Sequence, residues 1–326
     1  MKQRNIWIDC DPGIDDAVAL AMAAASRDQL NILGISTVAG NQISDRVTGN
    51  ALKLASFLGM EDVPVVRGAR GPLVRPVEPA GDVHGSTGLG DCQLPAATKQ
   101  TASESGIFYM YTRIMELPAG EQVTLVPTGP LTNIALLLGT FPEVRQRIEQ
   151  IVLMGGSSSG GNVTPAAEFN IWADPEAAHM VFGAGLPIVM CGLDVTLKSG
   201  LDGAQIKKLC QSDRKVEQAC GQMLSFYLNT TRHEGEENMV AIHDAVTILF
   251  LTDPDLFSGK NAAVQVDCSW GENRGRTICA ECPDAGVVGT GDAAEDLSLS
   301  APVYLLDQVN LPEFQRVLLS KLVSLG

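Results

Sequence analysis

Short apolar runs alternate with amphipathic patterns through the first two thirds of the chain, and this alternation constrains the fold more than any other feature. The apolar runs predict strands at 5–10, 30–39, 63–66, 122–128, 150–155 and 186–192. Apolar residues spaced three and four apart predict helices between them, at 14–26, 43–59, 103–117, 130–139 and 175–184. Strict alternation of strand and helix produces right-handed βαβ units. We therefore expect an α/β fold with an open, mostly parallel sheet and helices on both faces.

The last third of the chain has a different pattern. It predicts longer helices at 202–211, 213–230 and 243–252, an apolar run at 262–269 and a final helix near 311–323. No repeat, low-complexity linker or change of composition divides the 326 residues, which are enough to bury a large core. We expect a single domain over residues 1–326, with a βαβ core at about 1–200 and a helical cap with C-terminal elements at about 201–326.

The formal net charge of −15 argues against nucleic acid or an anionic membrane as a partner, because lysine and arginine hold phosphate groups. No apolar run reaches the roughly 18 residues of a membrane-spanning helix, and the first residues lack the features of a secretory signal. We therefore expect a cytoplasmic protein. The eight cysteines do not indicate a disulfide scaffold in a chain of this length. Cys279 and Cys282 form a CxxC pair, which is a weak zinc signal without a second pair nearby.

The segment DCDPGIDDAVAL, residues 9–20, contains four aspartates and no lysine or arginine. A proline and a glycine follow Asp11, so that Asp11 ends a strand while Asp15 and Asp16 lie in the first turn of a helix. A helix N-terminus stabilises an anion by roughly 0.3–1 kcal/mol, which does not account for three converging carboxylates. A divalent cation would relieve their repulsion, and an oxygen-only ligand set favours a hard ion over zinc. Helix capping by aspartate is the alternative for this segment taken alone.

Two other segments offer groups of the same kind. His243 and Asp244 stand at the start of a predicted helix, which places a titratable imidazole beside another acid. Thr128 ends a predicted strand, and the Gly-Pro turn after it leaves its carbonyl free to face a metal. Ligands bind beyond the carboxyl ends of the strands in open α/β sheets, so we expect the site to be assembled there.

These segments resemble those of one family, the nucleoside hydrolases of the inosine–uridine-preferring type. The segment at 9–20 is similar to the family signature DxDPGxDDAxA. The resemblance covers residues 6 to about 250, and further blocks stand in the family's order at 34–41, 84–90, 126–135, 151–156, 161–178 and 242–245. It implies a nucleoside hydrolase fold with a Rossmann-like core.

The resemblance implies hydrolysis of the N-glycosidic bond of ribonucleosides of the uridine, cytidine or inosine type, in nucleoside salvage or catabolism, with a tightly held Ca²⁺. It assigns the ion to Asp11, Asp16, Asp244 and the backbone carbonyl of Thr128. Asp11 is also implied as the general base for the attacking water, while the departing base needs stabilisation because the bond breaks through an oxocarbenium-like state. Relatives are commonly dimers or tetramers, so a homo-oligomer is expected.

The resemblance also assigns the substrate contacts. Ribose hydroxyls fall to Asp15, Asn41, Asn162, Glu168 and Asn170. His84 and His243 fall on the base side, and His243 is the candidate to assist the leaving base because imidazole titrates near neutrality. For His84, a base contact and a structural role in its glycine-rich loop both stay open.

The segment 225–244 departs from the pattern of pyrimidine-preferring relatives. Thr231 and Gly235 stand where those relatives tend to have Gln and Tyr, and Tyr227 has no assigned place. The preferred base therefore stays open.

Two other functions match parts of the pattern. A haloacid dehalogenase-type phosphotransferase would use Asp9 and Asp11, but that family has Thr or Val where this chain has Gly13. A non-catalytic, calcium-dependent nucleoside- or ribose-binding protein would keep the aspartates without turnover. The presence of every residue assigned to the chemistry disfavours this second alternative.

Overall fold

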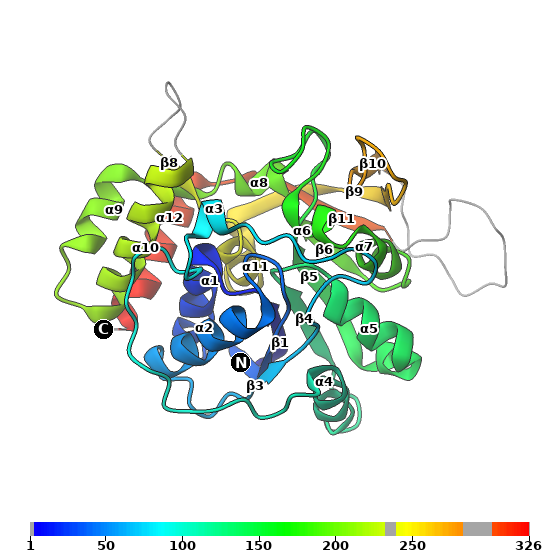
Figure 1. The fold of residues 1–326 in the computed structure, drawn as a ribbon, viewed down its shortest axis with the longest axis horizontal. Coiled ribbons are helices and arrows are strands. Elements are labelled where there is room, and N and C mark those ends of the chain that lie inside the picture. The colour runs from blue at the N-terminus through cyan, green and yellow to red at the C-terminus, as the bar shows by residue number, and fades with distance from the viewer. Residues whose placement is uncertain (1–2, 232–238, 283–301, 326) are drawn as a thin grey trace, which may run out of the picture.

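A nine-stranded sheet forms the centre of the computed structural model, which describes residues 3–231, 239–282 and 302–325 (Figure 1). Across the sheet the strand order is β10-β9-β11-β6-β5-β4-β1-β2-β3. The strands are β1 Arg4–Cys10, β2 Leu30–Thr37, β3 Val65–Arg67, β4 Val123–Pro127, β5 Ile148–Met154, β6 Ile188–Cys191, β9 Phe257–Val266, β10 Thr277–Glu281 and β11 Val303–Val309. A separate antiparallel pair joins β7 Gly200–Asp202 to β8 Met239–Ala241.

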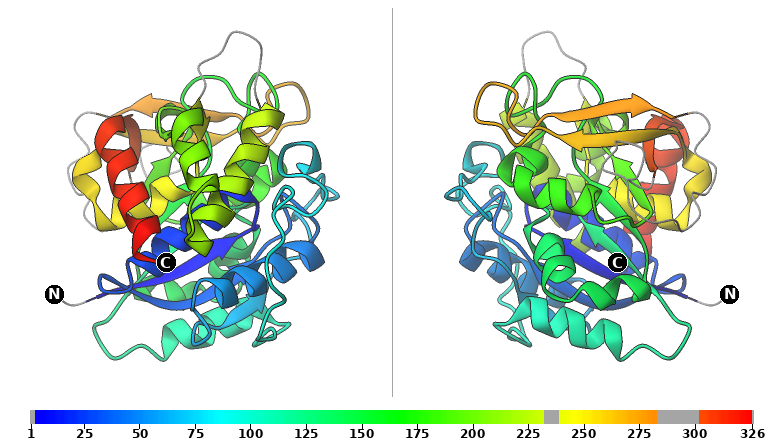
Figure 2. Two further views of the ribbon diagram at one scale, coloured as in Figure 1. Left: turned by 90° about the vertical axis from the view of Figure 1, so that its left-hand side faces the viewer. Right: turned by 90° about the vertical axis from the view of Figure 1, so that its right-hand side faces the viewer.

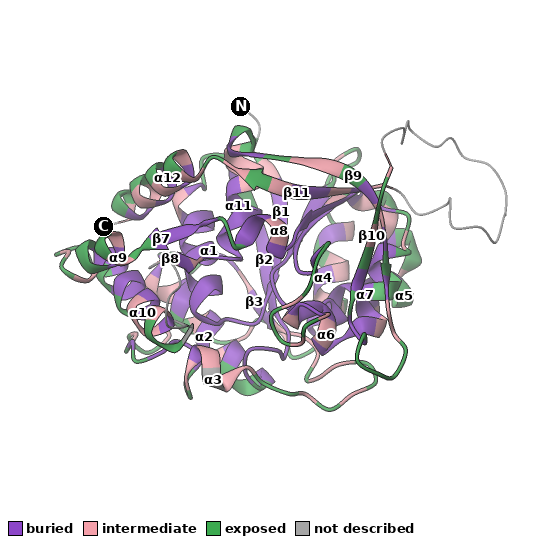
Figure 3. Ribbon diagram, turned by 90° about the horizontal axis from the view of Figure 1, so that it is seen from above, coloured by how far each residue is buried: buried purple, intermediate pink, exposed green. Residues whose placement is uncertain are grey.

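The sheet is mostly parallel, as predicted. All pairs from β11 to β3 in this order are parallel, and only β9 runs antiparallel to its neighbours β11 and β10. Each of the six predicted strands is present. Seen from above, these central strands are buried along most of their length (Figure 3).

Helices cover both faces of the sheet, again as predicted (Figure 2). They are α1 Ile14–Ala25, α2 Ser44–Phe57, α3 Gly81–His84, α4 Gly106–Met115, α5 Thr132–Thr140, α6 Phe169–Ala173, α7 Pro175–Phe182, α8 Leu193–Thr196, α9 Gly203–Cys210, α10 Lys215–Thr231, α11 Ala245–Thr252 and α12 Leu311–Ser324, with the 3₁₀ turns η1 Pro142–Arg147 and η2 Pro254–Leu256. Ile6 and Ile8 on β1 pack in one core with α1, α2 and α9 to α12, whereas Trp7 packs in the other with α4, α5 and α7. Successive side chains of β1 therefore point to opposite faces of the sheet and pack into two separate hydrophobic cores. None of the described helices is both long and apolar enough to cross a membrane.

The last third of the chain contributes more to the sheet than the sequence predicted. We expected helices and an apolar run at 262–269 after about residue 200, but β9, β10 and β11 all extend the main sheet. The signal is weak because β9 and β10 are half exposed and carry polar residues between apolar ones. The sequence analysis also missed five short elements, α3, α6, α8, β7 and β8. Each has three to five residues, which is less than two periods of the helical or the strand pattern.

Close packing between β1 and β2 gives a stability prediction. A Cβ added to Gly34 would lie 2.5 Å from the buried ring of Trp7. Gly34→Ala is therefore expected to lower the free energy of unfolding by roughly 1–3 kcal/mol through overpacking. Gly49→Ala is the control, because a Cβ at that position in α2 meets nothing within 4 Å. It should be neutral or stabilising by about 0.5–1 kcal/mol. Urea unfolding followed by circular dichroism measures both, and equal stability of the two variants would contradict the packing account.

Candidate active site

A cavity of about 320 Å³ opens at the carboxyl ends of the central strands. Nine of the predicted site residues line it: Asp15, Asn41, His84, Thr128, Asn162, Glu168, Asn170, His243 and Asp244. They come from the starts of α1, α6 and α11, from α3, and from the loops after β2, β4 and β5, so the fold gathers segments that are far apart in the sequence. Asp11 and Asp16 are fully buried and do not line the cavity.

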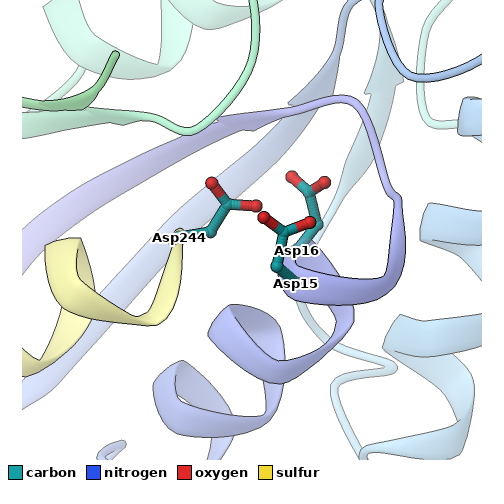
Figure 4. A group of neighbouring side chains, drawn as sticks. All are labelled: Asp15, Asp16 and Asp244. Atoms are coloured by element: carbon teal, nitrogen blue, oxygen red, sulfur yellow. The ribbon is translucent and has the colours of Figure 1, made fainter. Parts of the chain in front are cut away.

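Three buried carboxylates converge beside this cavity, and two of them, Asp15 and Asp244, line it. One oxygen each of Asp15, Asp16 and Asp244 lies within 4.8 Å of the others, with two side chains projecting from the start of α1 and the third from the start of α11 (Figure 4). None of the ion pairs among the described residues involves these aspartates. The grouping includes Asp15, which the resemblance assigns to ribose.

Asp16 is both a cap of α1 and a member of this cluster. Its Oδ2 accepts a hydrogen bond from the backbone N–H of Gly13 at 2.9 Å, and its Oδ1 accepts one from the hydroxyl of Thr128 at 2.8 Å. The carbonyl of Thr128 accepts one from the side-chain amide of Asn170 at 2.8 Å. A carbonyl oxygen has two lone pairs, so that of Thr128 keeps one for a further partner. Capping and cation binding therefore do not exclude each other here.

Asp11 lies beside the cluster in a niche between two turns. Its Oδ2 accepts from the backbone N–H of Asn41 at 2.7 Å, and its carboxylate lies against Gly129. Its Oδ1 is buried without a hydrogen-bond partner among the described residues, as is Oδ1 of Asp15. Two orphaned carboxylate oxygens in one region indicate a missing cationic or donor group.

The pKa shifts of the carboxylates also indicate a cation among them. Burial raises the pKa of Asp11 well above its usual range, and the neighbouring charge of Asp16 raises it further. Burial and then the charge of Asp15 do the same to the pKa of Asp244. Ionising several such groups together is costly unless a cation lies among them. The donor set consists of oxygen alone, which fits a hard divalent ion.

The residues assigned to ribose are fixed mainly by backbone contacts. Glu168 caps α6, and its carboxylate accepts from the backbone N–H groups of Gly156, Asn170 and Ile171 at 2.9–3.1 Å. Burial raises the pKa of Glu168 to about 7. Asn162 is exposed at the cavity rim, where its side-chain oxygen accepts from the backbone N–H of Phe169.

Both histidines on the base side are buried and have one ring nitrogen occupied by the protein. Nδ1 of His84 accepts from the backbone N–H of Ile14 at 3.2 Å, so this ring supports the start of α1 as well as lining the cavity. Burial lowers the pKa of His84 to about 4, which keeps the ring neutral at pH 7 with its proton on Nε2. Nδ1 of His243 lies 2.8 Å from the hydroxyl of Thr196, and burial lowers the pKa of His243.

Two aromatic residues of the site were given no role by the sequence analysis. Tyr227 lines the cavity, with its ring centroid 5.6 Å from that of His84. Trp172 lines it too, and the guanidinium of Arg75 lies 4.1 Å from the centroid of its ring. Trp172 lies within the block 161–178, which already resembled the family, so an aromatic residue in that block could have been predicted to line the site. The side chain of Thr231 and all of Gly235 lie outside the described residues.

Asp9, two residues before Asp11, belongs to a buried hydrogen-bond network beside the site. Its Oδ1 accepts from the side-chain amide of Asn133 at 2.6 Å and from the hydroxyl of Ser36. Burial raises the pKa of Asp9 to about 7. The described cysteines, including Cys279 and Cys282, are free thiols.

The chain is similar to named nucleoside hydrolases in both sequence and fold. Residues 6–316 match the family model described as "Inosine-uridine preferring nucleoside hydrolase". The pyrimidine-specific ribonucleoside hydrolase RihA of Shewanella woodyi is 44% identical over 276 residues, which are 84% of this chain and 88% of the relative. Two solved structures are also similar. The plant nucleoside hydrolase PpNRh1 superposes with a TM-score of 0.89 at 30% identity, covering 98% of this chain and 99% of its own. The purine-preferring ribonucleoside hydrolase from Gardnerella vaginalis has a TM-score of 0.86 at 29% identity, covering 99% of each chain.

The buried carboxylates predict that a divalent cation stabilises the protein more at high pH than at low pH. Burial, reinforced by the charge of neighbouring carboxylates, raises the pKa of Asp11 and of Asp244 well above the roughly 4 of an unfolded chain. Each group keeps its proton in the folded state at pH values above about 4, where it ionises in the unfolded chain, so the metal-free protein loses stability as the pH rises from about 4. A cation binds the ionised carboxylates and opposes the loss.

The measurement is the Tm in excess Ca²⁺ and in EDTA, at about pH 5 and about pH 8. The gain in Tm should be small at the lower pH and several degrees at the higher. Asp244→Asn should lose most of the gain, whereas Asp62→Asn should keep it, because the Asp62 side chain is 62% exposed and pairs with Arg27. The same gain at both pH values would show that the cation does not compete with protons at these carboxylates.

Proposed function

The chain belongs to the inosine-uridine preferring nucleoside hydrolase family, and we propose from this that it hydrolyses pyrimidine ribonucleosides to free base and ribose in a calcium-dependent reaction. Its relatives are ribonucleoside hydrolases, and the chain is an enzyme of that class, acting on N-glycosyl bonds. The observation that carries the proposal is the cluster of Asp15, Asp16 and Asp244 beside a cavity that amide and imidazole side chains line.

Calcium fits this donor set better than a soft metal does. Asp11, Asp16, Asp244 and the carbonyl of Thr128 would hold the ion, and every one of these groups offers oxygen. When bound, Ca²⁺ supplies a Lewis acid that orients hydroxyls and lowers the pKa of a water molecule. Asp15 belongs to the same oxygen cluster and lines the cavity, so it would bind ribose hydroxyls beside the ion.

Asp11 is suited to act as the general base. The backbone N–H of Asn41 fixes its Oδ2, while its Oδ1 has no hydrogen-bond partner among the described residues and is free to accept a proton. Burial raises the pKa of Asp11, which makes the carboxylate more basic than one exposed to water. The attacking water would lose its proton to Asp11 as it adds to the anomeric carbon of an oxocarbenium-like ribose.

The sugar would bind between the carboxylates and the α6 segment. Asn41, Asn162, Glu168 and Asn170 line the cavity and supply both donors and acceptors for hydroxyl groups. The backbone bonds to Glu168 hold its carboxylate in one orientation without using a basic side chain. Recognition through the hydroxyls gives a reason to reject 2′-deoxyribose, because buried polar groups would lose their partners.

The base would leave toward the two histidines and Tyr227. His243 would donate a hydrogen bond to the departing base, and the neutral His84 would offer an Nε2–H to a carbonyl oxygen such as that at position 2 of a pyrimidine, because both side chains line the cavity. The 44% identity with a pyrimidine-specific relative supports uridine and cytidine over inosine as substrates. We place the reaction in cytoplasmic nucleoside salvage or catabolism and expect a dimer or tetramer.

The reaction predicts a pattern of base release across substrates. Purified protein should release ribose from uridine and cytidine faster than from inosine or adenosine. It should release almost no uracil from 2′-deoxyuridine, which differs from uridine by one hydroxyl. Removing divalent metal should abolish release and adding Ca²⁺ should restore it. A protein that binds Ca²⁺ and ribose but releases base from none of these would be a binding protein.

Asp11→Asn tests the assignment of the general base. The amide keeps the size of the side chain and removes its basicity, so kcat for uridine should fall by roughly 10²–10⁴-fold. Inhibition of the remaining activity by ribose should partly survive. Asp62→Asn serves as the matched surface control and should keep wild-type kinetics. Unchanged ribose release by Asp11→Asn would refute the assignment.

A further inference from the structure

A buried hydroxyl lies against the histidine on the base side of the cavity. Oγ1 of Thr196 and Nδ1 of His243 are 2.8 Å apart. Thr196 is 0% exposed and does not line the cavity, whereas His243 does. The ring therefore turns its Nδ1 edge into the protein interior, and Nε2 is the ring nitrogen left for the cavity. The described residues provide no hydrogen bond to that Nε2.

The small β7–β8 ladder holds the two segments in register. The backbone N–H of Ile242 donates to the carbonyl of Ser199 at 2.8 Å, which continues the ladder toward the cavity. A Cβ at Gly200 would lie 2.0 Å from the carbonyl oxygen of Val240. The two strands are therefore so close at this point that only glycine fits there. This ladder has no part in the main sheet. Its effect is to place the C-terminal end of α8 opposite the N-terminal end of α11.

A hydroxyl can hold this histidine in each of the two protonation states that keep a proton on Nε2. When the ring is neutral and the hydroxyl donates to Nδ1, the proton lies on Nε2. When the ring carries both protons, the hydroxyl accepts from Nδ1–H instead, and Nε2–H is again the group on the cavity side. A side chain without a hydroxyl supports neither state.

We propose that Thr196 is a positioning residue for nucleoside hydrolysis, whose hydroxyl holds the His243 ring so that Nε2–H donates to the departing base. The inference deepens the proposed function and rests on it. Thr196 touches no substrate in this account and acts only through His243. Its contribution should therefore depend on how much help the leaving group needs.

Substituting Thr196 and varying the leaving group tests this. Thr196→Val removes the hydroxyl at nearly constant size, and kcat for uridine should fall roughly 10- to 100-fold while KM changes by less than about threefold. With 4-nitrophenyl β-D-ribofuranoside, whose phenolate leaves without a donor, kcat should change by less than about threefold. Thr196→Ser keeps the hydroxyl and should stay within about threefold of wild type on both substrates.

Two further comparisons separate positioning from folding. Thr124→Val is the matched control, because Thr124 is equally buried and bonds to Glu149 but lies outside the cavity wall. It should keep wild-type kinetics on both substrates. If Thr196→Val does not fold, Thr196→Ser and Thr196→Ala provide a pair that differs by a single hydroxyl, and only the alanine variant should lose uridine turnover.

The outcomes that overturn the inference are distinct. Wild-type kcat for uridine in Thr196→Val would show that the hydroxyl does not position His243. An equal loss on uridine and the nitrophenyl riboside would show that Thr196 supports the sugar side or the fold. Failure of the wild-type protein to release base from any ribonucleoside would overturn the proposed function, and this inference with it.

Discussion

The repulsion among buried carboxylates at the start of α1 is the constraint on which the site depends. Asp15, Asp16 and Asp244 bring oxygens within 4.8 Å of one another, and Asp11 lies beside them with one oxygen unpaired. Burial alone would keep these groups protonated, as the raised pKa values of Asp11 and Asp244 indicate. A bound divalent cation would let the site hold several ionised carboxylates at neutral pH. The cation site and the catalytic base are thus two consequences of the same arrangement.

The fold supplies this arrangement through the order of its strands. The strands β5, β4, β1 and β2 are neighbours in the parallel sheet, so their carboxyl ends deliver Glu168, Thr128, Asp11 and Asn41 to one edge. Local hydrogen bonds then fix each group: Asn41 holds Asp11, and Asn170 holds the carbonyl of Thr128. Most of these bonds run between a side chain and the backbone, which keeps the geometry rigid without basic residues that would compete for the carboxylates.

Much of the fold and site could be predicted from the sequence, because the information is local there. The strand before Asp11 and the helix after it have clear periodicities, and the turn between them contains proline and glycine. The parts of the site that were not predicted depend on contacts between segments that are distant in the sequence. Tyr227 and Thr196 reach the site from α10 and α8, and sequence spacing alone does not show that their side chains lie beside His84 and His243. The grouping of Asp15 rather than Asp11 with Asp244 depends on side-chain direction, which spacing does not encode.

The metal content of the purified protein tests the central claim most directly. The protein would be stripped, dialysed against equal concentrations of Ca²⁺, Mg²⁺ and Zn²⁺, and analysed by plasma mass spectrometry beside Asp244→Asn. Our account predicts about one tightly held Ca²⁺ per wild-type chain and a large loss in the variant, because oxygen ligands in a flexible carboxylate cluster favour calcium. Protein that retained no divalent ion, or retained zinc in its place, would contradict it.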